Sequence, residues 1–472
     1  HTAYDKLYAN LQTGLGNDTG LVIPSRADSP DLQLMDRADQ RAYYSEGTWR
    51  TMFDPSSWTN RFPALWWYLA IQLIALPMIP ILWRLFPGLP DRGYALAKTG
   101  GLIATGYLAW LIASVRLLQW GQIPIVIAWA ALWIVAILCL RGQGALFWRS
   151  LRDRRLWFGA AEIIFVAGFA LAVWIRMQNP NLWNPWSGGE KPMDLAYFNA
   201  TIRTPFFPPY DPWFRNGTIH YYYWGLVPWA MLSRLTGIVP TTAYNLAVPG
   251  VFALFLLNVW SVAAAFLAHL VPARPGLAHT RRFNGRLRIM LLALIAPIVT
   301  GILGNLQLVR LIGEGIWEGT KPAPADWPHW GALSDMLWGA WQIVSRTATL
   351  PVTSSYWDPT RVIPGTINEF PYFSFIFGDL HPHYTTLPLL TAMIGVIAGF
   401  VFSIGPRIGS GRWKPSPIFS SLGGWKPGLA MTLIGGLLGG MLMASNSWDF
   451  PPSMALLCAA GLIVIGTTSG WT

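Results

Sequence analysis

Long apolar runs recur along the chain from about residue 60 onward, and they decide which kinds of fold are open to it. A helix needs about 20 apolar residues to cross the hydrocarbon core of a bilayer. Of the 472 residues 53% are apolar and only 12% are charged, against about 25% charged in a typical soluble domain. We therefore predict an all-α polytopic membrane protein, with spans near residues 62–83, 99–115, 121–140, 156–175, 242–270, 289–303, 384–404 and 427–444 and a further one at 450–468.

The charged residues are sorted between the loops that join these runs. Short loops rich in Lys and Arg stay on the cytoplasmic side of a membrane, whereas most of the 22 acidic residues lie in the other connections. The alternation is consistent only if segment 221–236 does not cross, so we expect a juxtamembrane helix at the interface or a re-entrant element there. The four basic loops contain Arg84, Arg92 and Lys98; Arg141, Arg149, Arg152, Arg154 and Arg155; Arg274, Arg281, Arg282, Arg286 and Arg288; and Arg407, Arg412, Lys414 and Lys426.

This sorting predicts the order of the parts and their location. We expect a multi-pass membrane protein with the long loops and residues 1–60 outside the cytoplasm. The chain begins with His1 and lacks a signal-peptide pattern, so we expect it to be a fragment of a longer protein. The predicted parts are a soluble segment at 1–60, N-terminal transmembrane helices at 61–175, an outer loop with juxtamembrane helices at 176–241, and a transmembrane core at 242–472 with an outer loop at 304–383.

Other features exclude several classes of function. The net charge of +11 would suggest nucleic acid as the partner of a soluble protein, but here the positive charge belongs to the cytoplasmic loops and we expect no nucleic acid. Both cysteines, Cys139 and Cys458, lie inside apolar runs, which excludes a disulfide framework and a cysteine metal site. No Gly-rich loop ends in Lys-Ser or Lys-Thr, the pattern of a phosphate-binding loop.

The outer segment 179–225 carries the first candidate site. If a helix starts near Pro192, Glu190 and Asp194 flank its first turn, where the helix dipole favours ionised carboxylates. An ionised carboxylate beside the bilayer and among aromatic residues suits a general base that takes a proton from a hydroxyl. We predict Asp194 as this base, with Glu190 as the second choice. The alternative is a helix cap in which Glu190 pairs with Lys191 or Arg203.

The same segment offers residues that could bind a substrate. Interfacial aromatic residues are commonly bilayer anchors, but they can also form a platform for a sugar or a lipid. Arginine can hold a phosphate with two hydrogen bonds, or it can pair with nearby carboxylates. The candidates are Arg203, Asp211, Arg215, His220, Tyr221, Tyr222 and Tyr223.

A second constellation lies at residues 367–388. Asp379, His381 and His383 alternate, and Glu369 lies ten residues before Asp379. Imidazole and carboxylate groups can ligate a divalent cation, which we expect to be Mg²⁺ or Mn²⁺. A hydrogen-bonded histidine network that binds phosphate is the alternative.

A third constellation, at residues 445–452, joins the last two apolar runs. Asn446, Trp448 and Asp449 are the candidate substrate-binding residues here. A carboxylate at the membrane surface needs a partner or water, so Asp449 should pair with an Arg or His of another loop. The alternative is a helix cap before Pro451. Glu162, near the start of the fourth run, is expected to form a structural ion pair.

Six ordered motifs carry a resemblance to a known family. The chain resembles a family of large archaeal and Chloroflexi-type membrane proteins of unknown function that is nicknamed for its Tyr-Tyr-Tyr motif, and the resemblance runs from about residue 60 to the end. This resemblance implies that the membrane is the plasma membrane of a prokaryote. The motifs are LPDRGYALAKTGG…YLAWLIAS (89–114), GEKPMDLAYFNATIR (189–203), PPYDPW (208–213), HYYYWG (220–225), FGDLHPH (377–383) and NSWDFP (446–451).

The layout is also similar, more distantly, to the GT-C glycosyltransferases, which use lipid-linked sugar donors. That resemblance implies a GT-C-like helix bundle with a catalytic acidic motif in its first long outer loop, followed by two juxtamembrane helices. Asp194, or Glu190, falls where it puts the base, and 221–236 where it puts the second juxtamembrane helix. The usual acidic doublet is replaced by Glu190-x-x-x-Asp194.

We therefore predict a membrane glycosyltransferase that moves a sugar from a polyprenyl-phosphate donor to an extracytoplasmic acceptor. In this hypothesis Asp194 deprotonates the acceptor hydroxyl, while Arg203, Arg215 or a cation holds the donor phosphate. The competing class is a non-enzymatic membrane protein, either a subunit or scaffold of a larger assembly or a transporter. Expected partners are membrane lipids and the lipid-linked sugar, together with further subunits or a missing part of the chain.

Overall fold

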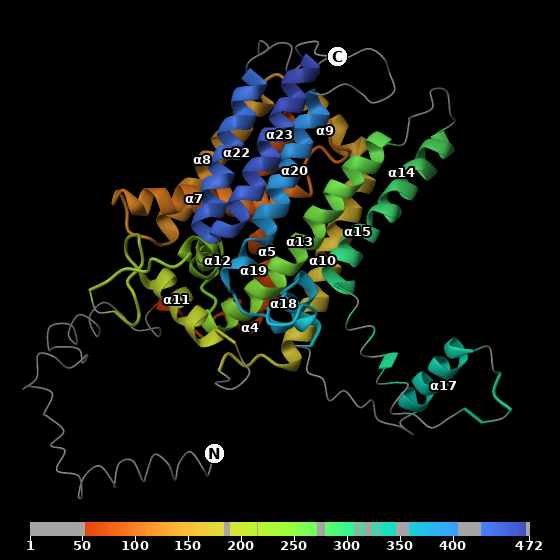
Figure 1. Ribbon diagram of the computed structural model, residues 1–472. Helices are drawn as coiled ribbons and strands as arrows, with labels where there is room; N and C mark the ends of the chain where they lie inside the picture. The colour runs from red at the N-terminus through yellow and green to blue at the C-terminus, as the bar shows by residue number, and fades with distance from the viewer. Residues whose placement is uncertain are drawn as a thin grey trace, which may run out of the picture. The chain divides into compact units, whose positions relative to one another are not determined.

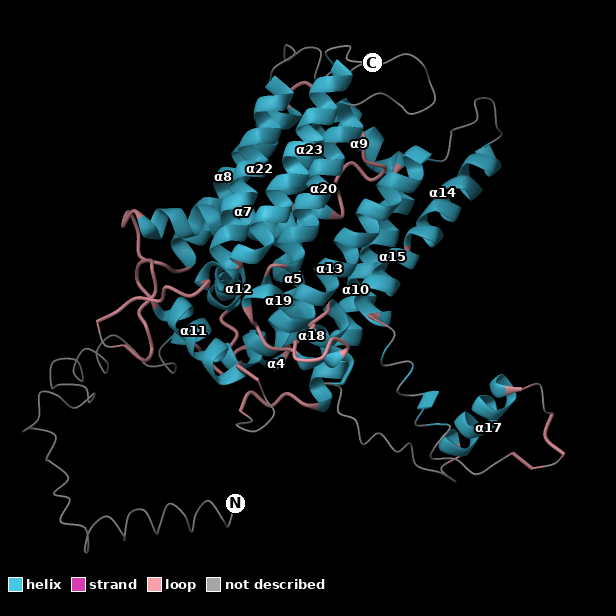
Figure 2. Ribbon diagram, viewed as in Figure 1, coloured by secondary structure: helices cyan, strands magenta, loops and turns pink. Residues whose placement is uncertain are grey.

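The computed structural model describes residues 52–183, 189–214, 216–270, 279–305, 358–404 and 426–468, together with parts of 307–345. Every regular element in these ranges is a helix (Figures 1 and 2), apart from an isolated bridge between Tyr210 and Thr218. The all-α prediction is therefore confirmed for this part of the chain. Two compact units are distinguished, His1–Pro55 and Ser56–Thr472, and the helical bundle belongs to the second.

Some predicted features lie outside the described residues. They are most of segment 1–60, Arg215, the basic residues Arg274, Arg407, Arg412 and Lys414, and the side chains of Arg281, Arg282 and Lys426.

Six helices in the described ranges are long and apolar enough to cross a membrane. The first predicted span is instead two helices, α5 (Pro63–Ala75) and α6 (Met78–Leu85), bent by 47°. The last two predicted spans coincide with α22 (Lys426–Ser445) and α23 (Phe450–Thr468). The six are α7 (Leu96–Ser114), α8 (Gln122–Leu140), α10 (Arg155–Gln178), α13 (Pro240–Leu270), the composite Gly285–Leu303 and the composite Pro382–Ser403.

Shorter helices make up the two composites and the connections. Gly285–Leu303 contains most of α14 (His279–Ala293), α15 (Ile295–Ile298) and the π-helical turn η2 (Val299–Leu303). Pro382–Ser403 contains α19 (Pro382–Thr385) and nearly all of α20 (Leu387–Ile404). The remaining elements are α4 (Trp58–Arg61), α9 (Gly144–Asp153), α11 (Lys191–Arg203), η1 (Tyr223–Leu226), α12 (Val227–Thr236), α17 (Ala332–Val344), η3 (Asp358–Arg361), α18 (Pro371–Phe377) and η4 (Ser447–Asp449).

Helix α13 is the central helix of the bundle. It packs against α10, α14 and α20, and two thirds of its most apolar stretch is buried in the protein, as expected for a helix that is apolar all round. Its Asn258 amide donates to Thr99 Oγ1 at 3.0 Å, to the Pro388 carbonyl at 3.0 Å and to Thr391 Oγ1 at 3.2 Å. This amide therefore ties α7 and α20 to α13.

The segment predicted not to cross contains α12, a helix of 10 residues. At 1.5 Å per residue this is about 15 Å, half the thickness of a bilayer core. Every residue from Val227 to Ser233 is buried, and the helix packs against α5, α7, α11 and α13. This packing fits the re-entrant alternative better than a helix that lies on the bilayer surface.

Glu162 forms the expected ion pair, and its partner is Lys98 of α7. Tyr94 Oη donates to Glu162 Oε1 at 2.8 Å, and Gln72 Nε2 donates to Oε2 at 2.7 Å. Only 2% of the Lys98 side chain is exposed. Lys98 therefore belongs to the interior and not to a basic surface loop. Its ion pair with Glu162 is needed there, because a buried ammonium group requires a partner of opposite charge.

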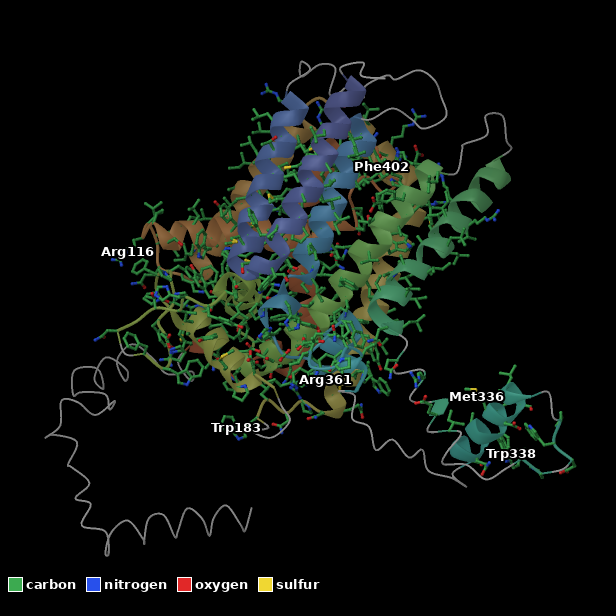
Figure 3. The ribbon with its side chains drawn as sticks, in the orientation of Figure 1. Arg116, Trp183, Met336, Trp338, Arg361 and Phe402 are labelled. Atoms are coloured by element: carbon green, nitrogen blue, oxygen red, sulfur yellow. The ribbon has the colours of Figure 1, made fainter. Side chains whose placement is uncertain are left out.

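The bundle has two chemically different ends. Figure 1 shows α9 and the start of α14 at one end and α11 and α18 at the opposite end. Figure 3 likewise shows Phe402 at the end opposite Trp183 and Arg361. The arginines of the 141–155 loop lie at the α9 end, whereas the candidate acidic and histidine residues lie at the α11 end.

Candidate functional site

The site begins at the N-terminus of α11. Glu190 is the N-cap residue, Pro192 is in the first turn, and the Asp194 N–H donates to the Glu190 carbonyl at 2.9 Å. The predicted helix start is therefore confirmed. The two carboxylates lie in different surroundings, because the Glu190 side chain is 52% exposed and Asp194 only 2%.

Gly189 fixes the loop that leads into α11. Its φ of +65° is unfavourable for other residues, and an added Cβ would lie 2.2 Å from the Phe377 ring and 3.3 Å from Asp379 Oδ2. The absence of a side chain thus lets the start of α11 pack directly against the end of α18. This contact brings Asp379 beside Glu190 and Asp194 from a distant part of the sequence.

Asp194 and Asp379 form a buried acidic pair. Each has one oxygen, Oδ2 of Asp194 and Oδ1 of Asp379, without a hydrogen-bond partner among the described residues. Burial raises the pKa of Asp194 well above its ordinary value, and the charges of Asp379 and Glu190 raise it further. Burial also raises the pKa of Asp379, against the lowering effect of Lys191. Burial of Asp194 therefore opposes the ionisation that its place at the helix start was expected to favour, because the charged form loses its hydration. A carboxyl group with a raised pKa is a stronger base once it has lost its proton.

The two histidines of the FGDLHPH motif face each other beside this pair. Their Nδ1 atoms are 2.5 Å apart, so a proton can be shared between them. His381 Nε2 lies 2.8 Å from Glu190 Oε2, and His383 Nε2 lies 2.6 Å from Glu369 Oε2. The hydrogen bond from His383 holds the pKa of Glu369 below its usual value, while burial and His383 lower the pKa of His381. The result is a continuous chain from Glu190 to Glu369.

Two cationic residues lie next to the acidic pair. Lys191 Nζ is 4.1 Å from the centroid of the Phe377 ring, a cation–π contact. Burial lowers the pKa of Lys191 to about 8, against the opposing effect of Asp379. Arg176, at the end of α10, donates from Nε to Asn245 Oδ1 at 2.7 Å and from Nη1 to the Asn179 carbonyl at 2.9 Å.

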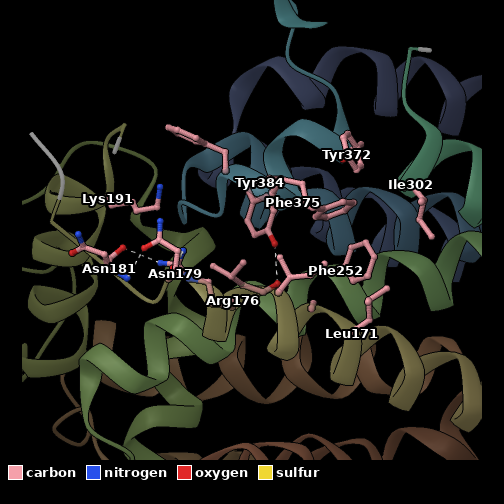
Figure 4. A pocket seen from close by; sticks show the side chains of 16 residues that line it. Leu171, Arg176, Asn179, Asn181, Lys191, Phe252, Ile302, Tyr372, Phe375 and Tyr384 are labelled. Atoms are coloured by element: carbon pink, nitrogen blue, oxygen red, sulfur yellow. Dashed lines mark hydrogen bonds between the residues drawn. The ribbon is translucent and has the colours of Figure 1, made fainter. Parts of the chain in front are cut away.

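A pocket of about 400 Å³ opens beside these cations, between α10, α13, α18 and η2. Figure 4 shows Arg176, Asn179, Asn181 and Lys191 at one end of it and apolar side chains along the rest. Leu171, Ile302 and Ile376 are 42%, 39% and 38% exposed, so the apolar part opens on the outer surface of the bundle. On a membrane-spanning helix such exposed apolar side chains are expected to face lipid.

The three tyrosines of the HYYYWG motif point to three different partners. Tyr221 Oη lies 3.1 Å from His381 Nε2, and Tyr222 Oη lies 2.7 Å from Ser447 Oγ. Tyr223 accepts a hydrogen bond from Trp110 Nε1 at 3.3 Å. They do not form one flat shelf, and they connect the outer segments to one another.

The remaining predicted residues are divided between the cluster and other places. Asp449 accepts from Thr386 Oγ1 at 2.7 Å and from Asn446 Nδ2 at 3.0 Å, so its direct partners are neither Arg nor His. Trp448 is 83% exposed. Asp211 accepts from the backbone N–H groups of Trp213 and Phe214 and thereby holds its own turn.

Arg203 lies in the last turn of α11, whereas Asp194 lies in its first turn, and His220 is exposed. Burial raises the pKa of the Tyr210 phenol, and the positive charge of Arg203 opposes this shift. Sequence reasoning missed Arg176 and Lys191 as binding groups. The sequence offers only one indication of a binding role for each residue: Arg176 ends an apolar run, and Lys191 directly follows Glu190.

The predicted metal ligands do not form a ready-made metal site. In the parts of the chain that the structure describes, no three His, Cys, Asp or Glu side chains are arranged to hold one ion. The chemistry of the donors nevertheless fits in part. Metal-binding histidines usually bond their second nitrogen to a carboxylate, and both His381 and His383 have such a carboxylate on Nε2 while their Nδ1 atoms converge.

The spans, the buried charges and the loops that meet at one end define a polytopic α-helical membrane protein. Residues 104–472 match the profile of a family of uncharacterized membrane proteins, DUF2298, and the chain belongs to this family. The match begins at residue 104 rather than near residue 60, so the first part of the 89–114 motif precedes it. No curated protein and no solved structure matches the chain.

Proposed function

We propose that the protein is a membrane glycosyltransferase that transfers a sugar from a polyprenyl-phosphate donor to an acceptor hydroxyl. One observation carries the proposal: a buried acidic pair with unpartnered oxygens lies next to a pocket that is largely apolar, has exposed apolar lining residues, and is cationic at one end. The pocket suits an amphipathic donor, and the acidic pair suits removal of a proton from the hydroxyl group of the acceptor. The distant GT-C resemblance points to the same class.

The donor is proposed to enter the pocket from the bilayer. Its isoprenoid chain would lie against the apolar walls formed by Leu171, Phe252 and Phe375, and its phosphate would meet Lys191 and Arg176. A lipid phosphate is stabilised by charge-assisted hydrogen bonds from such groups. Arg203, Arg215 or a cation was expected from the sequence to hold this phosphate; Lys191 and Arg176 are proposed here because they line the pocket.

The acceptor is proposed to react beside α11. Asp194 takes the hydroxyl proton as the acceptor oxygen bonds to the anomeric carbon, and the bond from that carbon to the phosphate oxygen breaks. Polyprenyl phosphate leaves with the electron pair, and a single displacement inverts the anomeric carbon. The unpartnered Oδ2 of Asp194 supports this role, because it is an acceptor for the hydroxyl proton. Glu190, which is half exposed, lies where an acceptor can arrive.

His381 and His383 are proposed to stabilise the phosphate that departs. A divalent cation would be held by their Nδ1 atoms with Asp379, and it would supply positive charge beside the leaving group. Imidazole with carboxylate ligands favours Mn²⁺ over Mg²⁺. Without a cation, the protonated histidine pair offers the charge itself, which is the alternative.

The experiment that tests the proposal is sugar transfer from a radiolabelled polyprenyl-phosphate donor in reconstituted vesicles. Asp194→Asn should reduce the rate by about 10²–10⁴-fold, the usual contribution of a general base. Glu190→Gln should have a smaller effect if Asp194 is the base, and the larger effect if the roles are exchanged. Asp211→Asn is the matched control, because this carboxylate accepts hydrogen bonds from the backbone of its own turn and has no role in the proposed proton transfer.

Two outcomes would reject the proposal. Wild-type protein that transfers no sugar from any polyprenyl-phosphate donor, while still folded by thermal unfolding, would favour the non-enzymatic class. Equal activity of the wild type and Asp194→Asn would remove Asp194 from the mechanism.

Removal of divalent cations distinguishes the two roles of the histidine pair. We expect chelation with EDTA to abolish transfer and added Mn²⁺ to restore it better than Mg²⁺. His383→Gln should raise the Mn²⁺ concentration needed for half-maximal activity. Full activity in EDTA would instead support the histidine network that acts without metal.

A further inference from the structure

A second pocket lies at the basic end of the bundle, far from α11 along α10. It has a volume of about 790 Å³ and opens between the turn that joins α9 to α10 and the helices α13 and α14. Four guanidinium groups line it, from Arg152, Arg154, Arg155 and Arg286, with Asp153 as its one lining carboxylate among the described residues. Nothing in the proposed transfer reaction uses this pocket.

Hydrogen bonds fix two of these guanidinium groups in place. Arg154 donates from Nε to the Pro90 carbonyl and from Nη1 to Ser150 Oγ, each at 3.0 Å. Arg286 donates from Nη1 to the backbone carbonyl of Asp153 at 3.2 Å. In the described part of the chain the Nη2 atoms of both have no hydrogen-bond partner, and Arg152 and Arg155 form no ion pair. The pocket thus holds like charges together without an equal number of carboxylates.

The surroundings of the pocket are those of a lipid headgroup. The candidate span α10 begins at Arg155, and Leu156, Trp157 and Ile289 supply apolar lining. On α14 the adjacent Leu287 is 44% exposed. An inorganic ion gains nothing from contact with apolar side chains. A phospholipid has both a charged phosphate and an apolar acyl-glycerol part, which can contact the arginines and the apolar lining together.

We propose that this pocket binds the phosphate headgroup of an anionic phospholipid. Basic pockets between spanning helices on the cytoplasmic side bind anionic headgroups, and arginine forms two parallel hydrogen bonds to a phosphate. The bound lipid neutralises the arginine cluster and links α14 to the α9–α10 turn. The site is independent of the proposed transferase activity.

The test compares two double variants that remove the same charge. Arg152→Gln/Arg155→Gln alters the pocket, and Arg141→Gln/Arg149→Gln alters exposed arginines of the same loop that do not line it. Each purified protein is analysed for retained lipid by native mass spectrometry. Thermal unfolding is then measured in nanodiscs of phosphatidylcholine, of phosphatidylcholine with added inorganic phosphate, and of phosphatidylcholine with phosphatidylglycerol.

Phosphatidylglycerol should be retained by the wild type and should raise its unfolding temperature, whereas inorganic phosphate should not. The pocket variant should bind it about thirtyfold more weakly, since it lacks two basic residues and each contributes a factor of about five near an anionic surface. The control variant should bind it as the wild type does. Equal loss in both variants, or equal protection by inorganic phosphate, would overturn the proposal. The single variant Arg155→Gln serves if the double variant does not fold.

Discussion

Burial and the nearby carboxylates have opposite effects on the pKa of Lys191. Burial lowers its pKa to about 8, while Asp379 and Asp194 favour the charged form. A donor phosphate binds the charged form, so kcat/KM should fall as the pH rises above about 8. Lys191→Arg keeps the charge at any accessible pH and should move this fall to higher pH. The measurement is the pH profile of kcat/KM for both proteins, which reports groups of the free enzyme.

The profile also separates binding from structure. Lys191→Met should raise KM for the donor at neutral pH, where the wild-type lysine is charged. If Lys191→Arg has the same alkaline limb as the wild type, Lys191 does not hold the phosphate and another group sets the limb.

Single residues were predicted well where the signal was local. The placement of Glu190 and Asp194 at a helix start followed from Pro192, and the proximity of the two histidines from their spacing. Arg176 was not predicted, because its meaning depends on a pocket built by four segments far apart in the sequence. The three tyrosines show the converse, since neighbours in sequence diverge once their backbone turns at Tyr222, which has a φ of 32°.

At the scale of elements, apolar composition predicted helices but not how each one ends or bends. Most of the expected spans coincide with observed helices, because a long apolar run in a bilayer can satisfy its backbone only as a helix. The bend between α5 and α6 and the burial of α12 depend on what packs against them. Hydropathy contains no information on these contacts.

The amide of Asn258 gives a test of this packing. Asn258→Leu should destabilise the protein by about 1–2 kcal/mol, the upper range for hydrogen bonds between membrane helices. The loss arises because Leu has no donors for Thr99, Thr391 and the Pro388 carbonyl. Thermal unfolding in detergent measures it. Ile163→Leu, on the 70% exposed Ile163 of α10, is the control and should leave the unfolding temperature nearly unchanged.

An Asn258 variant as stable as the control would mean that van der Waals packing alone holds α7, α13 and α20 together. That result would assign the three-helix contact to small and apolar residues instead.

At the scale of the whole molecule, the few charged residues divide the bundle into two ends. The described part of the arginine-rich loop 141–155 lies at one end, and the carboxylates and histidines of the candidate site lie at the other. The sequence predicted this separation because charge is expensive inside a bilayer and accumulates where the chain leaves it. It did not predict the buried Lys98–Glu162 pair, since pairing across two helices depends on their register.

Cysteine labelling tests which end faces outward and whether α12 crosses. In a background with Cys139→Ala and Cys458→Ala, single cysteines are introduced by Arg149→Cys, Trp213→Cys and Pro364→Cys, all at exposed positions. A membrane-impermeant maleimide should label the 213 and 364 variants in intact cells and the 149 variant only after lysis. Two crossings, α13 and the Gly285–Leu303 helix, separate residues 213 and 364, so they share a side only if α12 does not cross. Labelling of 213 and 364 from opposite sides would make α12 part of a span, and outside labelling of 149 would place the candidate site in the cytoplasm.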